Sequence, residues 1–156
     1  MRALATLLVT LLLAACYEVD GPVVERGRRV EGVADGSYRR ADGQVVTLAW
    51  DQTAGLYRLG EGGTVRVETL AGGLLLADYA AGRHIALLAA VQGDAVVFYM
   101  PGKDGAARLA KAHGVALRPG PVDRLGGSPD AVRAFLRAAA ATSDLVESGR
   151  LERVTR

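Results

Sequence analysis

The sequence predicts an α+β domain that is mainly β: an antiparallel meander of about seven short strands, in a curved sheet or partly open barrel, followed by two C-terminal helices. Three observations predict this fold class. Between residues 36 and 101, short runs rich in Val, Leu, Tyr and Trp are separated by evenly spaced turn signals. Within these runs, apolar and polar residues alternate with the period of a strand. The last third of the chain instead carries helix caps and helical periodicity.

The turn signals are Asp-Gly and Gly-containing loops at 42–43, 51–55, 60–63, 71–73, 81–83 and 92–94. Glycine in such loops supplies the positive φ angles that tight turns between antiparallel strands require. The intervening runs are the predicted strands, at 36–40, 44–50, 56–59, 64–70, 74–80, 84–91 and 95–100.

Alternation assigns the faces of the early strands. In 44–50, Val46, Leu48 and Trp50 share one face, and in 64–70 the valines at 65 and 67 oppose charged neighbours. The strands at 74–80, 84–91 and 95–100 are apolar on both faces. Such strands are typical of a sheet covered by a second layer, so we expect the downstream helices to cover it.

The last third supplies these helices. The first is predicted over 104–113, with Asp104 as its cap and Gly114 as the residue that ends it. A short strand over 115–117 follows. Ser128 before Pro129 starts a second helix, predicted to lie on the sheet or plug an open barrel end. Its apolar side has helical spacing, with Val132, Phe135, Leu136 and Ala139. The tail, 142–156, fits either a short helix or a strand.

The segment from 17 to 34 is rich in charge of both signs and contains Gly21, Pro22 and Gly27. This composition predicts an extended tether, or a peptide that folds on contact with a partner. The expected organisation is therefore a signal peptide over 1–15, a modified cysteine with a flexible tether over 16–35, and a single β-rich domain over 36–156.

The first 16 residues have the pattern of a targeting signal. Arg2 is followed by an apolar run from Ala3 to Ala15, which ends in Leu13-Ala14-Ala15-Cys16. A membrane-spanning helix needs ~20 apolar residues, so this run is too short to span. The pattern resembles the lipobox of bacterial lipoproteins. The resemblance implies cleavage before Cys16, a diacylglyceryl group on its thiol, and a second acylation of the new amine, with palmitate-type chains. Two or more chains make a stable anchor.

By the same resemblance, Tyr17 after the cysteine, in place of Asp, favours the outer membrane on its periplasmic face. The alternative is the outer leaflet of the cytoplasmic membrane. Cys16 is the sole cysteine, so no internal disulfide is expected. The formal net charge of +2 gives no reason to expect a nucleic-acid partner.

Candidate chemistry is sparse, and no catalytic residue, cofactor or metal site is predicted. His84 and His113 fall on different elements without a second ligand at metal spacing, so each is expected to be structural. No serine stands in a Gly-x-Ser-x-Gly elbow. Five carboxylates are interpreted as solvated surface charge: Asp51, Glu61, Glu68, Asp78 and Asp94. Six aromatic residues of the strands either line a pocket in a curved sheet or form ordinary core: Tyr38, Trp50, Tyr57, Tyr79, Phe98 and Tyr99.

Two functional hypotheses follow. The first is a non-enzymatic envelope lipoprotein, held to the membrane through Cys16, whose β domain binds an envelope protein, a cell-wall component or a lipid. Lipocalin-like carriage of a small apolar molecule is a variant that needs an empty interior. The second is a small periplasmic hydrolase or an inhibitor of one. It requires His84 or His113 to meet a carboxylate or a serine inside a concave site.

Overall fold

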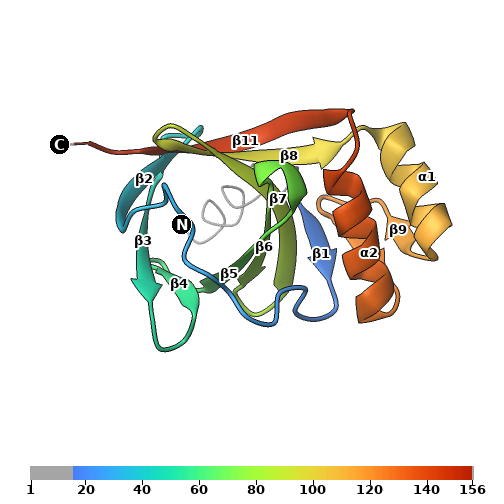
Figure 1. The fold of residues 1–156 in the computed structure, drawn as a ribbon, viewed down its shortest axis with the longest axis horizontal. Helices are drawn as coiled ribbons and strands as arrows, with labels where there is room; N and C mark the ends of the chain where they lie inside the picture. The colour runs from blue at the N-terminus through green and yellow to red at the C-terminus, as the bar shows by residue number, and fades with distance from the viewer. Residues whose placement is uncertain (1–15, 156) are drawn as a thin grey trace, which may run out of the picture.

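The structure, a computed structural model, describes residues 16–155 (Figure 1). In chain order the strands are β1 (Tyr17–Val19), β2 (Gly36–Arg40), β3 (Val45–Asp51), β4 (Leu56–Leu59), β5 (Thr64–Thr69), β6 (Leu75–Ala80), β7 (His84–Gln92), β8 (Ala95–Pro101), β9 (Ala116–Arg118), β10 (Asp123–Gly126) and β11 (Leu145–Arg153). The helices are α1 (Lys103–His113) and α2 (Pro129–Ala140), and a single 3₁₀ turn, η2 (Ala71–Gly73), joins β5 to β6.

Eight of these strands close into an antiparallel barrel. Each strand from β2 to β8 pairs with the next strand along the chain, including β6 with β7. β11 lies between β8 and β2 and pairs with both. All seven predicted strands form, but the predicted seven-strand meander is wrong, because the ambiguous tail supplies an eighth strand. Pairing of Leu151 with Arg40 on one side and Val96 on the other closes the ring.

A second, smaller group of strands extends from β7. Residues 88–92 of β7 pair with β8, whereas residues 84–86 pair with β1 on the same edge. β10 then runs parallel to β1, and β9 pairs antiparallel with β10. The prediction of a strand near 115–117 is confirmed by β9. Periodicity gave no sign of β1 and β10, because strands of three and four residues are too short to show one.

Both helices lie on the same side of the barrel, against its outer face (Figure 1). α2 buries the four predicted apolar residues, and its Phe135 ring packs edge-on against Tyr17 with ring centroids 5.5 Å apart. These residues form one cluster with Leu76, Ala86 and Leu88 of β6 and β7. The second layer predicted for the doubly apolar strands is therefore confirmed.

The helix ends largely follow the sequence. Ser128 caps α2, since its Oγ accepts a hydrogen bond from the Ala131 amide at 3.2 Å. Gly114 ends α1 in the left-handed conformation, at φ 65°. Asp104 is not the cap of α1, because the helix begins one residue earlier, after Gly102, and its N-cap uses no side chain.

Residues 16–35 differ from the predicted tether. β1 lies in the sheet, and the remainder, residues 20–35, crosses the barrel as a packed segment that we call the N-terminal strap. Its Val23, Val24 and Val33 are buried. Composition indicated a solvated spacer because charged residues outnumber the valines, yet the few valines are enough to fix the segment against the barrel.

Candidate functional site

The most concentrated chemistry in the described residues is a carboxylate–imidazole pair on the outer face of the barrel. The β6–β7 register pairs Ala80 with His84 and Asp78 with Ala86, so Asp78 and His84 are diagonal neighbours on one face. His84 Nδ1 lies 2.9 Å from Asp78 Oδ1. Asp78 is only 2% exposed, which corrects its interpretation as solvated surface charge.

The other oxygen of Asp78 binds the strap. Asp78 Oδ2 accepts hydrogen bonds from the Val23 amide at 2.7 Å and the Val24 amide at 3.4 Å. Both carboxylate oxygens are therefore occupied, one by the imidazole and one by main chain. A buried charge needs such partners, so the arrangement fixes the strap to the barrel.

The same pair has two members of a hydrolytic triad, with the carboxylate orienting the ring through Nδ1. A triad also needs a nucleophile. Among the hydrogen bonds of residues 16–155, none joins a serine or threonine hydroxyl to His84. His113 lies elsewhere, in the last turn of α1. Nor does this part of the chain contain a group of three or more His, Cys, Asp or Glu placed to hold a metal ion.

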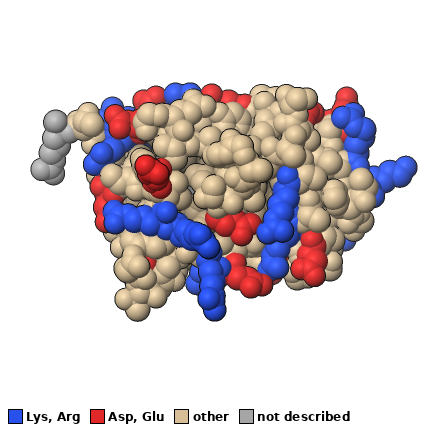
Figure 2. All heavy atoms as spheres, in the orientation of Figure 1, with Lys and Arg blue, Asp and Glu red and all other residues tan. Residues whose placement is uncertain are grey.

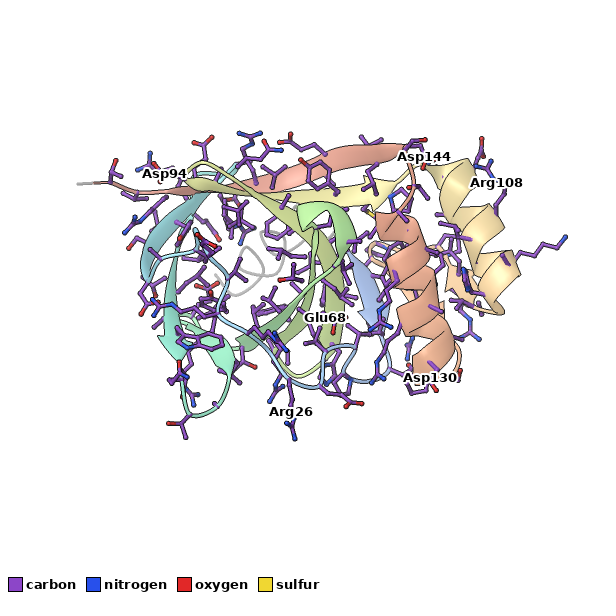
Figure 3. All side chains as sticks on the ribbon, in the orientation of Figure 1. Arg26, Glu68, Asp94, Arg108, Asp130 and Asp144 are labelled. Carbon is purple, nitrogen blue, oxygen red and sulfur yellow. The ribbon has the colours of Figure 1, made fainter. Side chains whose placement is uncertain are left out.

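The other predicted carboxylates stay on the surface. Asp51 pairs with Arg58 at 2.7 Å, and Glu68 pairs with Arg137 at 3.5 Å. The Ala54 amide, and then Arg58, hold the pKa of Asp51 below its ordinary value. In Figure 3, Glu68 lies between the barrel strands and α2, and Asp94 lies on the side of the molecule away from the helices. Basic and acidic side chains are interspersed on the face shown in Figure 2.

Five of the six strand aromatics point into the barrel. Tyr38, Tyr57, Trp50 and Phe98 belong to the interior cluster, in which Trp50 packs edge-on against Tyr57 at 4.9 Å between ring centroids. Tyr79 has the same orientation by alternation with Ala77. Tyr99 faces the outer cluster instead, so it is not part of this lining.

The strap covers one end of this interior. Its Val30 and Val33 join the interior cluster. The Val30 amide donates to the Tyr57 hydroxyl at 2.8 Å, and the Tyr38 hydroxyl donates to the Ala34 carbonyl at 2.8 Å. Burial is the main cause that raises the pKa of both phenols. Two inward-facing tyrosines thus hold the strap across the barrel end.

The surface of the described residues includes two hollows. A groove of about 360 Å³ lies between the start of η2 and the end of α2, crossed by the Glu68–Arg137 pair. A smaller one, about 170 Å³, lies where β2 meets the end of β11. Both are lined by exposed or half-exposed residues, so neither gathers reactive groups as the Asp78–His84 pair does.

Cys16, the predicted lipidation residue, lies immediately before β1 and is 2% exposed. The three preceding residues of the Leu-Ala-Ala-Cys pattern lie outside the described part of the chain. No helix within the described range is long and apolar enough to cross a bilayer.

The described residues of this site do not form a complete catalytic set, so similarity to known proteins would be the other guide to function. Comparison of the chain with protein-family models, curated proteins and solved structures finds no match.

Proposed function

We propose that this chain is an envelope lipoprotein, lipidated on Cys16 and held at the periplasmic face of the outer membrane, whose barrel is a non-enzymatic binding module. The observation that carries the proposal is the position of the lipobox relative to the fold. Cleavage before Cys16 leaves every described element intact, since β1 begins at Tyr17.

The fold gives the anchor a physical consequence. Because β1 and the strap are packed, no unstructured spacer separates Cys16 from the barrel. Lipid on Cys16 therefore holds the barrel directly against the headgroups, with residues of β1 and its neighbours nearest to the membrane. A lipoprotein on a long tether would instead sample a wide volume above the bilayer.

Mass spectrometry of the mature N-terminus, from membrane fractions of the native host, tests this proposal. We expect acylated Cys16 as the first residue, and we expect a Cys16→Ser variant to lose the lipid and the membrane fraction. A Cys16→Ser, Ser143→Cys variant is the control, because it keeps one cysteine at an exposed position. Recovery of the intact N-terminus, or acylation of the control, would overturn the proposal.

A second candidate, a small periplasmic hydrolase or a hydrolase inhibitor, is favoured by one observation, the 2.9 Å contact between His84 and Asp78. It is tested by comparing ester hydrolysis by the wild-type chain and a His84→Gln variant. The binding-module proposal expects no difference between them, whereas a large loss in the variant would favour the hydrolase.

A further inference from the structure

A larger share of the apolar residues is left partly exposed in the interior cluster of the barrel than in the outer cluster. The outer cluster contains 14 buried residues with eight partly buried neighbours, whereas the interior cluster has eight buried and nine partly buried residues. Trp50 and Phe98, the two largest apolar side chains of the interior, are among those left partly exposed. An eight-stranded barrel is wide enough either to be filled by side chains or to hold one small ligand.

Small residues also occupy inward-facing positions. Ala77 and Ala89 occupy inward positions of β6 and β7. Gly149 of β11 lies opposite Phe98, where an added Cβ would be 3.8 Å from the ring. Phe98, which stays partly exposed, is therefore surrounded by small and apolar residues, a lining that suits a hydrocarbon chain.

The two ends of the interior differ in chemistry. The strap covers one end with Val30 and Val33, as described above. The other end of the interior lies at the β2–β3 turn. There β2 ends in Arg40, and alternation along the strand places Arg40 on the inward side with Tyr38. Arg40 also lies close enough to Tyr79 of β6 to act on its phenol: burial and Glu61 raise the pKa of Tyr79, and Arg83 and Arg40 partly oppose that rise.

The Arg40 guanidinium has spare hydrogen-bonding capacity although its side chain is only 10% exposed. Its Nη1 donates to Gln44 Oε1 at 3.1 Å, and its Nη2 lies 2.8 Å from Asp42 Oδ2. The latter contact is an ion pair without hydrogen-bond geometry, so Nε and Nη2 both lack a hydrogen-bond acceptor. Buried guanidinium donors in this state favour an anionic, bidentate acceptor.

We infer that the barrel interior binds a single-chain amphiphile with an anionic head, the hydrocarbon chain lying among Trp50, Phe98 and their neighbours and the head group at Arg40. This inference rests on the proposed binding function and names its ligand class. A chain enclosed by apolar side chains gains the transfer free energy of its methylenes, and one charged contact at the end sets its direction.

The test uses the mature chain from Cys16 onward, with Cys16→Ser, which keeps every described element and carries no lipid of its own. The probe is cis-parinaric acid, a fluorescent fatty acid. We expect saturable binding at one site per chain, and displacement by oleate or lysophosphatidate. The more effective competitor decides whether the head group is a carboxylate or a phosphate.

Two matched pairs of variants locate the site. Arg40→Gln should weaken binding of the acid about tenfold and leave binding of its methyl ester unchanged, whereas Arg39→Gln, on the exposed side of the same strand, should change neither. Ala89→Trp should block binding of both probes, and Val146→Trp, at an exposed position of β11, should not. Circular dichroism and the melting temperature confirm that each variant is folded.

Saturable binding with this pattern supports the inference. Absence of binding to the folded chain, or equal effects of Arg40→Gln and Arg39→Gln, overturns it. Either failure leaves the lipidation result at Cys16 untouched, because that measurement does not depend on the barrel interior. A chain that binds the fatty acid but is not acylated in the host would instead overturn the membrane anchor alone.

Discussion

Replacing Asp78 with alanine should release the N-terminal strap and destabilise the fold. The carboxylate is 2% exposed and makes two close contacts, 2.7 Å to the Val23 amide and 2.9 Å to His84 Nδ1. A hydrogen bond to a charged group is worth ~1.5–3 kcal/mol. The His84 side chain is 28% exposed and can be rehydrated, so we assign its contact the lowest free energy in this range. The variant leaves the Val23 amide buried without an acceptor, so we assign its contact the whole range of free energy.

The expected loss is therefore about 3–4.5 kcal/mol, within the ~3–5 kcal/mol typical of breaking a buried pair. At ~2–4 °C per kcal/mol for a chain of this size, the melting temperature should fall by about 6–18 °C. Urea unfolding gives the free energy, and hydrogen exchange of the Val23 and Val24 amides reports the strap directly. The control is Asp94→Ala, which removes an exposed carboxylate at the β7–β8 turn.

Two results would refute this reasoning. One is a loss of stability in Asp78→Ala no larger than in the Asp94→Ala control. The other is unchanged protection of the Val23 amide in a variant that is globally destabilised, since the strap would then be held by other contacts. Asp78→Asn should fall between the wild type and alanine, because its amide oxygen still accepts from the Val23 amide.

Three further changes test other parts of the fold. Phe135→Ala should cost ~3–5 kcal/mol in urea unfolding, because the ring is fully buried against Tyr17; a loss as small as that of the exposed-site control Val146→Ala would contradict the described packing. Ser128→Ala should cost ~1 kcal/mol through the lost cap of α2, and Ser128→Asp should restore the stability; equal stability of all three chains would exclude the cap. Burial raises the pKa of Tyr57 above 10.0, so the neutral phenol stabilises the fold below pH 10, and this stability is lost as the pH rises through the folded-state pKa. Melting curves from pH 8 to pH 12 should therefore show a shallower alkaline decline of the melting temperature in Tyr57→Phe than in the wild type. An unchanged decline would contradict the raised pKa.

Local signals in the sequence predicted most of the barrel. Each of the seven strands from 36 to 100 is bounded by a glycine-containing turn and pairs with its neighbour along the chain, so local information is sufficient. The tail could not be assigned in this way. Leu145, Val146 and Leu151 fit a helix or a strand equally well, and pairing with β2, which lies more than 100 residues away, decides in favour of the strand.

Part of the candidate site could be predicted from the sequence. Once a turn at 81–83 is placed between the two strands, Ala80 opposes His84, and Asp78 must lie diagonal to His84 on the same face. The sequence does not show that the strap covers this face. The burial of Asp78 depends on Val23 and Val24 of the strap, whose valines follow no regular period because the segment crosses strands instead of extending one.

The pairing of β2 with β11, and of β1 with β10, has a consequence for when this chain can fold. Tyr17 is paired with Asp123, and Arg40 with Leu151, so β1 and β2 complete their pairing only when residues from the last quarter of the chain are present. Pairings this distant in sequence carry a large loop-closure entropy and form late. A chain emerging N-terminus first therefore remains without a closed barrel until nearly all of it has been released. In the export that we propose for this chain, this order delays the native barrel until translocation is almost complete.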